Sequence, residues 1–176
     1  MVNSGVLKLP SEDDVLKMYD YVYKTLSKYK IYRYEVSNFA KKSHECKHNN
    51  NCWNMVEYVG FGVGSNSFLA NSRWGNESDL DTYINDIENN IPVVEFEENQ
   101  STEDLYDEYI MLKLRTKEGI DLNKIKLEYY YDILNIKRDE ILKLQKYKLI
   151  KIKKGFLSAT DEGFKVLNQI ILDLVY

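Results

Sequence analysis

Hydrophobic residues recur every three or four positions near the start of the chain, as they do on one face of an amphipathic helix. Ser11 precedes this segment, and Asp14 follows Ser11 at the spacing of a helix-capping pair. We therefore predict a helix from about Glu12 to Tyr29 that buries its hydrophobic stripe. The stripe consists of Val15, Met18, Tyr19, Val22, Leu26 and Tyr29.

The pattern changes to alternation in residues 31–36, where apolar or aromatic residues alternate with charged ones as in a half-buried strand. Residues 37–54 show no period and are rich in Asn, Lys and Ser, which predicts an irregular loop. Residues 58–69 are strand-like but interrupted by glycines, which mark places where another backbone or a ligand approaches closely. Arg73 and Trp74 are candidates for a short pairing strand.

Helical periodicity returns in the second half of the chain. Ser78 is the expected N-cap of the first helix there, and Pro92 limits its C-terminal end. Ser101 or Thr102 is expected to cap the second helix, which should end near Gly119. The predicted helices cover residues 79–89, 102–116, 122–131 and 138–147.

The last 57 residues follow the order helix, helix, hairpin and helix, which looks like a winged-helix module. The hairpin should turn at Lys154 and Gly155, and Thr160 should cap the final helix. The predicted fold class is α+β: a small β-rich segment with a long N-terminal helix, followed by a helical region with a winged-helix-like end. We divide the chain into residues 1–76 and a helical C-terminal domain of residues 77–176.

Composition places the chain among globular proteins. It has 176 residues, of which 44% are hydrophobic and 30% charged, and no apolar run approaches the roughly 18 to 20 residues of a membrane span. The first ten residues lack the features of a secretory signal, so we expect a cytoplasmic protein. The two cysteines are expected to be free thiols.

Charge is distributed unevenly along the chain. Residues 77–108 carry twelve Asp and Glu and no Lys or Arg, whereas residues 137–154 carry eight Lys and Arg. The basic block could contact nucleic-acid phosphates, although a solvated lysine-rich face is the more common case. Its residues are Lys137, Arg138, Lys143, Lys146, Lys148, Lys151, Lys153 and Lys154.

The segment between Tyr34 and Phe68 concentrates the side chains that can support chemistry. It holds both histidines, both cysteines and one of the two tryptophans. Three short motifs follow one another there: Y-E-V-S-N-F-A, H-N-N-N-C-W and G-F-G-V-G-S. If the chain has a ligand site, we expect it in this segment.

The three motifs resemble those of the oxygen-independent coproporphyrinogen III oxidase-like family, the radical-SAM proteins that include bacterial haem chaperones. Two positions depart from the family pattern, because Cys52 replaces a tyrosine and Ser65 an alanine. The matching residues are Glu35, Ser37, Asn38, Phe39 and Ala40 in the first motif, His48, Asn49 and Trp53 in the second, and Gly60, Phe61, Gly62, Gly64 and Ser67 in the third.

The resemblance implies a radical-SAM barrel that precedes this region and holds a [4Fe-4S] cluster, which cleaves S-adenosylmethionine, on a C-x-x-x-C-x-x-C motif. That motif is absent from the 176 residues, and two cysteines are too few for such a cluster. We therefore expect the C-terminal portion of a family member, inactive in radical chemistry by itself. The residues that the resemblance places near the barrel or its cofactor are Glu35, Ser37, Asn38, Asn49, Gly60, Gly62, Gly64 and Ser67.

Haem is the ligand that the resemblance favours. The implied function is haem binding or transfer to a haem-accepting protein, and the alternative is a part in the oxidative decarboxylation of coproporphyrinogen. His48 and Cys52 are candidate axial ligands, and Trp53 is a candidate to cover a porphyrin face. Alternatively, His48 and Asn49 only hydrogen-bond a loop while Trp53 fills the core.

A metal interpretation of the same segment is also open. His44, Cys46, His48 and Cys52 form an H-x-C-x-H-x-x-x-C pattern of the side chains that bind zinc. The two-residue spacings are not those of usual zinc modules, however. We therefore expect a polar loop here rather than a zinc site.

Overall fold

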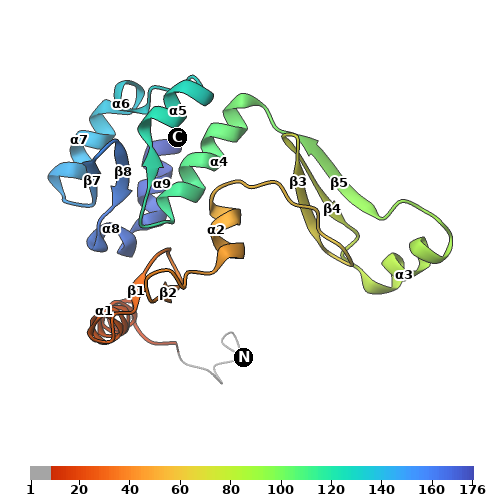
Figure 1. Ribbon diagram of the computed structural model, residues 1–176, viewed down its shortest axis with the longest axis horizontal. Coiled ribbons are helices and arrows are strands. Elements are labelled where there is room, and N and C mark those ends of the chain that lie inside the picture. The colour runs from red at the N-terminus through yellow and green to blue at the C-terminus, as the bar shows by residue number, and fades with distance from the viewer. Residues whose placement is uncertain (1–8) are drawn as a thin grey trace.

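The computed structural model describes residues 9–176 and shows a mixture of helices and small sheets. Figure 1 shows three regions: a C-terminal group of helices around a small sheet, an arm that extends away from it, and an N-terminal helix with a short hairpin. The expected lack of a secretory signal concerns the first ten residues, of which 1–8 lie outside the described part. No helix in the described part is long and apolar enough to cross a membrane.

The N-terminal region consists of helix α1 (Glu12–Lys28) and the two-residue strands β1 (Tyr32–Arg33) and β2 (Phe39–Ala40), which pair antiparallel. Ser11 caps α1, as predicted, by accepting a hydrogen bond from the backbone N–H of Asp14 at 3.2 Å. The prediction that α1 buries its stripe is wrong, because none of its residues is buried. Tyr19 and Leu26 of the stripe are partly buried, and Tyr19 contacts Arg33 of β1, whereas Val15, Met18 and Val22 are exposed.

Helix α2 (Lys47–Trp53) lies where the sequence predicted an irregular loop. The prediction failed because the helix is rich in Asn, which has a low helix propensity, and shows no hydrophobic period. Trp53 is only half-buried, and no residue of α2 is fully buried. Figure 1 shows α2 between the N-terminal hairpin and helix α4 (Thr102–Leu114).

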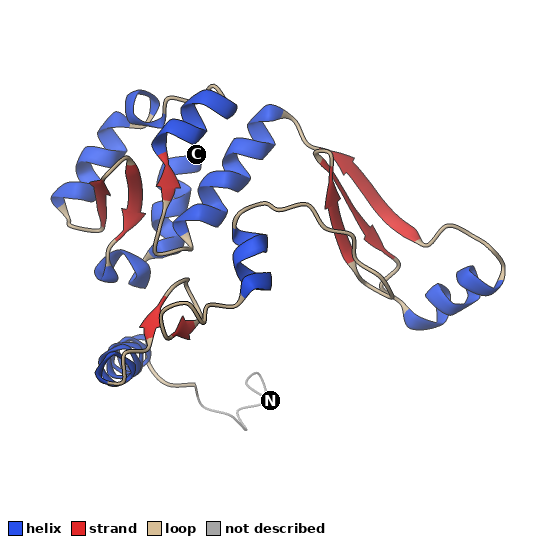
Figure 2. Ribbon diagram, viewed as in Figure 1, coloured by secondary structure: helices blue, strands red, loops and turns tan. Residues whose placement is uncertain are grey.

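The arm is a three-stranded antiparallel sheet with one helix at its far end (Figure 2). The predicted short strand around Arg73 is confirmed within β4, whereas residues 58–69 yield a strand only at their end. Strand β5 was not predicted, because its row of acids resembles a solvated loop. The helix is capped by Asp79 and not by Ser78, since an oxygen of Asp79 accepts a bond from the N–H of Thr82 at 2.9 Å. The elements are β3 (Asn66–Leu69), β4 (Ser72–Asn76), α3 (Leu80–Glu88) and β5 (Val94–Asn99), in the sheet order β3-β4-β5.

The C-terminal group contains the main hydrophobic core. Its hairpin turns at Lys154 and Gly155, as predicted, and both residues have positive φ. The final helix is divided at Val166, and α6 was not predicted. The elements after α4 are β6 (Ile120–Asp121), α5 (Leu122–Glu128), α6 (Ile133–Ile136), α7 (Arg138–Lys146), β7 (Ile150–Lys153), β8 (Phe156–Ala159), α8 (Asp161–Lys165) and α9 (Leu167–Val175), with the sheet order β6-β8-β7. Core members from α4, β6, β8 and α9 include Ile110, Leu114, Ile120, Leu157, Ile170 and Leu174.

A buried arginine joins the N-terminal region to the C-terminal group. Arg33 of β1 is 3% exposed, and its guanidinium forms an ion pair with Asp161 of α8 at 2.6 Å. The guanidinium carbon also lies 4.0 Å from the ring centroid of Phe164, a cation–π contact. This cluster holds β1 against the start of α8.

Candidate functional site

The first motif forms the turn between β1 and β2. Glu35 is 0% exposed, and one carboxylate oxygen accepts a bond from the N–H of Ser37 at 3.1 Å. The other oxygen, Oε1, is buried and has no partner among the described residues. Ser37 and Asn38 are exposed, and the carbonyl of Asn38 accepts the N–H of Tyr34 at 3.2 Å. The backbone of Glu35 also forms an isolated antiparallel β-bridge with Thr116, just after α4. This bridge fixes the turn against the C-terminal group.

The second motif lies on α2, where residues four apart share one face. His48 and Cys52 are therefore neighbours, with 3.9 Å between the Nε2 and Sγ atoms, and both side chains are exposed. Asn49 is half-buried and accepts a bond from the thiol of Cys46 at 3.4 Å. Trp53 is half-buried, and its Nε1 atom is buried without a partner among the described residues. An imidazole and a thiol are thus presented together to solvent.

A buried lysine holds α2 against α4. The ammonium of Lys113, a residue that is 5% exposed, donates to Asn54 Oδ1 at 2.8 Å and to Glu118 Oε2 at 3.0 Å. Asn54 is the C-cap residue of α2. Cys52 itself lines a small cavity of about 100 Å³ together with residues of the sheet and of α4. The position of the His48 and Cys52 pair therefore depends on tertiary contacts at the end of its helix.

The zinc pattern is not assembled in the described part of the chain. No group of three or more His, Cys, Asp or Glu side chains lies close enough there to hold a metal ion. His44 instead places Nδ1 3.1 Å from the carbonyl of Lys42. Of the four candidates, the structure brings together His48 and Cys52, while Cys46 pairs with Asn49.

The third motif is a compact turn leading from α2 into the arm. The N–H of Gly60 donates to Oγ of the buried Ser67 at 3.0 Å, and a Cβ at Gly60 would lie 2.3 Å from the carbonyl oxygen of Asn66. Gly62 has φ of +100°, which side chains rarely adopt, and Gly64 donates its N–H to the carbonyl of Glu77 at 2.8 Å. A close backbone contact within this chain thus accounts for Gly60, and the backbone conformation accounts for Gly62.

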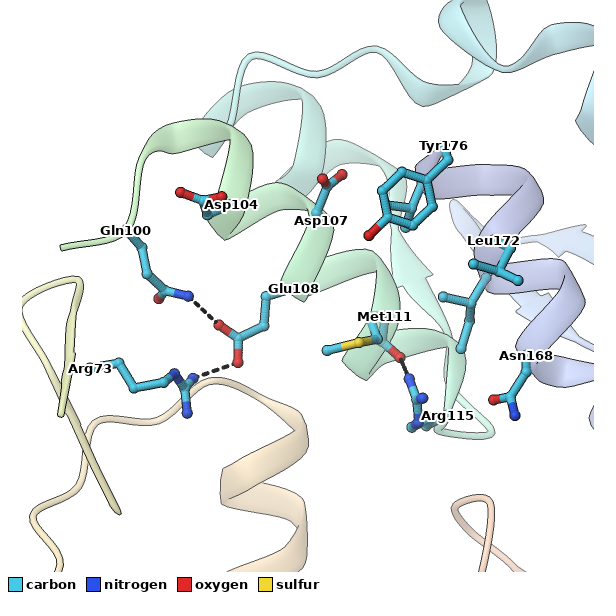
Figure 3. Close-up of a pocket in the computed structure, with 12 residues that line it drawn as sticks. Arg73, Gln100, Asp104, Asp107, Glu108, Met111, Arg115, Asn168, Leu172 and Tyr176 are labelled. Atoms are coloured by element: carbon cyan, nitrogen blue, oxygen red, sulfur yellow. Dashed lines mark hydrogen bonds and ion pairs between the residues drawn. The ribbon is translucent and has the colours of Figure 1, made fainter. Parts of the chain in front are cut away.

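A larger cavity lies elsewhere, in a groove of about 530 Å³ between α4 and α9 (Figure 3). Sequence reasoning did not find it, because its two walls lie more than fifty residues apart in the sequence. A useful signal was available: Asp104, Asp107, Met111 and Arg115 recur at helical spacing with polar and apolar side chains on one face. The lining residues are Arg73, Gln100, Asp104, Asp107, Glu108, Met111, Arg115, Asn168, Ile171, Leu172, Val175 and Tyr176.

Comparisons with known proteins agree with the fold and motifs. The model of the HemN C-terminal domain family matches residues 100–166. The chain is 31% identical to the haem chaperone HemW of Lactococcus lactis, over 94% of the chain and 43% of that protein. It is 28% identical to the HemW of Bacillus subtilis, over 97% of the chain and 45% of that protein. The fold matches that of coproporphyrinogen III oxidase (HemN) from Escherichia coli with a TM-score of 0.74, over 94% of this chain and 42% of that one, at 14% identity.

The fold and the family model together show that this chain contains a C-terminal domain of the HemN type. The resemblance seen in the motifs is confirmed: residues 100–166 match the HemN C-terminal domain family, and most of the chain is similar to part of the haem chaperones HemW. Within this family, the curated relatives quoted above are the haem chaperones HemW. The chain spans less than half the length of these relatives.

Proposed function

We propose that this chain is the haem-handling C-terminal part of a radical-SAM family protein of the haem chaperone type. The observation that carries the proposal is the placement of the family's second motif, because His48 and Cys52 lie 3.9 Å apart and exposed on one helix. Neutral imidazole and thiolate are both axial ligands of haem iron. Their exposure leaves room for a planar ligand to approach that face of α2.

We propose different roles for the motif residues. His48 is the proposed axial ligand, and Cys52 stands beside it as a second donor. Asn49 is directed toward Cys46 and keeps the first turn of α2 in place. Trp53 is half-buried and its indole nitrogen is enclosed, so its role is to anchor the helix and not to cover a porphyrin.

A radical-SAM barrel is the partner that we propose for the exposed apolar faces. Val15, Met18 and Val22 on α1 are 48%, 50% and 43% exposed, and Phe61 at the third motif is 89% exposed. Such surfaces are typical of interfaces. The [4Fe-4S] cluster and S-adenosylmethionine belong to that barrel, because the two thiols here are free, exposed and too few to hold the cluster.

Four further proposals concern the organisation, location and partner of the protein. The order of β6, three helices and the β7–β8 hairpin supports a winged-helix-like module at the C-terminal end. We propose the boundary between the two parts near residue 76, which lies within the arm between β4 and α3. The protein is proposed to act in the cytoplasm, and a haem-accepting protein is the proposed recipient.

The test is a haemin titration of the chain followed by visible absorption. We expect a Soret band distinct from that of free haemin, altered in His48→Ala. The matched control is His44→Ala, which removes the other exposed histidine of the same segment. Circular dichroism must show that both variants retain helical content.

Cys52→Ser separates the two candidate ligands. A spectrum changed by Cys52→Ser and not by His48→Ala would assign the iron to the thiolate. If His48→Ala and Cys52→Ser both keep the spectrum and affinity of the unmodified chain, then α2 does not bind haem, and the proposal for this site is wrong.

A further inference from the structure

The groove between α4 and α9 has an apolar wall and a charged rim. Met111 of α4, Leu172 and Val175 of α9, and the following Tyr176 all line the groove. Figure 3 shows Leu172 and Tyr176 on the α9 side of the groove. Leu172 is 49% exposed and Tyr176 is 90% exposed, so the groove is open to solvent. A cavity of about 530 Å³ with one apolar wall and several polar and charged side chains has the size of a small-molecule site.

Charges in the groove are separated into two ends. Asp104, Asp107 and Glu108 line one end, and Arg115 and Asn168 line the other (Figure 3). Glu108 is already neutralised by an ion pair with Arg73. The acidic end would repel a second anion.

Arg115 is the basic group of the groove that lacks an acidic partner. One guanidinium nitrogen donates to the carbonyl of Met111 at 2.7 Å. No carboxylate of the described residues lies within ion-pair distance of Arg115. Partial burial lowers the pKa of the guanidinium, because desolvation disfavours its charged form. The remaining guanidinium N–H groups are suited to a carboxylate.

We infer that this groove binds a tetrapyrrole, with its apolar body against Met111, Leu172 and Val175 and its carboxylates on Arg115. The shape and charges of the groove call for an apolar molecule with an anionic edge, and the choice of a tetrapyrrole rests on the proposed function. The carboxylate edge lies at Arg115, because the acids at the other end exclude it.

The groove is separate from the His48 and Cys52 pair, neither of which lines it. Arg73 and Glu108 stand between the two sites, since both line the groove and also the cavity of about 100 Å³ that includes Cys52. The chain therefore has two proposed binding sites for a tetrapyrrole. The site on α2 coordinates the iron, and the groove recognises the carboxylates.

Metal-free protoporphyrin IX is the probe, because without iron it cannot be ligated by His48 or Cys52. Its affinity for the chain is measured by fluorescence, together with that of its dimethyl ester, which lacks the free carboxylates. Arg115→Gln should weaken protoporphyrin IX about tenfold or more and leave the ester unchanged, because a hydrogen bond between charged groups is lost. Leu172→Asp should weaken both ligands. Arg138→Gln, which removes an exposed arginine of α7, is the matched control.

Three results would overturn the inference. They are no binding of protoporphyrin IX to the unmodified chain, equal affinity of Arg115→Gln and Arg138→Gln, or an equal loss of acid and ester in Arg115→Gln. Failure of the groove and failure of the haem site on α2 can be distinguished. If His48→Ala loses the haemin spectrum while Arg115→Gln leaves protoporphyrin IX affinity unchanged, the site on α2 is upheld and the groove is rejected. If His48→Ala keeps the haemin spectrum while Arg115→Gln weakens protoporphyrin IX binding, the groove is upheld and the site on α2 is rejected.

Discussion

The ion pair between Arg33 and Asp161 allows a quantitative test of how the N-terminal region is attached. Arg33 is 3% exposed, whereas the side chain of Asp161 is 65% exposed. Fully exposed pairs contribute about 0–1 kcal/mol, and breaking a buried pair costs about 3–5 kcal/mol. With one buried partner and one hydrated partner, we expect a coupling energy of about 2 kcal/mol between these limits.

The perturbation is a double-mutant cycle with Arg33→Met, Asp161→Asn and the double variant, each unfolded in urea and followed by circular dichroism. Arg33→Met should cost more than Asp161→Asn, because it also removes the contact with the ring of Phe164 at 4.0 Å. The double variant should lose less stability than the sum of the two single variants.

Lys126 and Asp132 provide a matched control cycle. Their ion pair has the same length of 2.6 Å, but the side chains are 59% and 40% exposed. We expect a coupling energy below about 1 kcal/mol there. If the coupling of Arg33 and Asp161 is no larger than that of the control pair, burial does not strengthen this interaction and the reasoning is refuted.

Three further predictions concern single residues. Gly60→Ala should speed hydrogen exchange of the β3 amides, because the new Cβ would lie 2.3 Å from the carbonyl oxygen of Asn66, at a cost of about 1–3 kcal/mol. Lys113→Met should speed exchange in α2 but not in α9, since it removes the bond to Asn54. Burial and neighbouring carboxylates raise the pKa of Asp107 above its usual 3.8, so the folded chain holds this proton more tightly. The free energy of unfolding should therefore fall as pH rises through the raised pKa, and urea titrations of Asp107→Asn should lack this fall. If Asp107→Asn and the unmodified chain show the same dependence of stability on pH, the prediction is contradicted.

Local sequence signals were sufficient for much of the secondary structure. Ser11, Ser101 and Thr160 cap helices where the sequence placed them, and Lys154–Gly155 forms the predicted turn. Caps and turns depend on residues within a few positions of one another. They can therefore be predicted without knowledge of the rest of the fold.

Elements that depend on distant partners were missed. Strand β5 exists because it pairs with β4, more than fifteen residues away, and its own acids favour exposure. Helix α2 has weak intrinsic propensity and is held by Lys113 through Asn54. The amphipathic pattern of α1 showed which face is apolar but not what covers it. The spacing of hydrophobic residues shows which face of a helix is apolar, but it carries no information about which element packs against that face.

The candidate sites divide in the same way. The sequence by itself indicated the family resemblance, through three motifs whose residue types and order are local properties. It also identified His48 and Cys52, but their proximity follows from the helix that only the structure revealed. The groove with Arg115 depends on tertiary structure alone. Its two walls, α4 and α9, are more than fifty residues apart in the sequence and lie together only in the folded core.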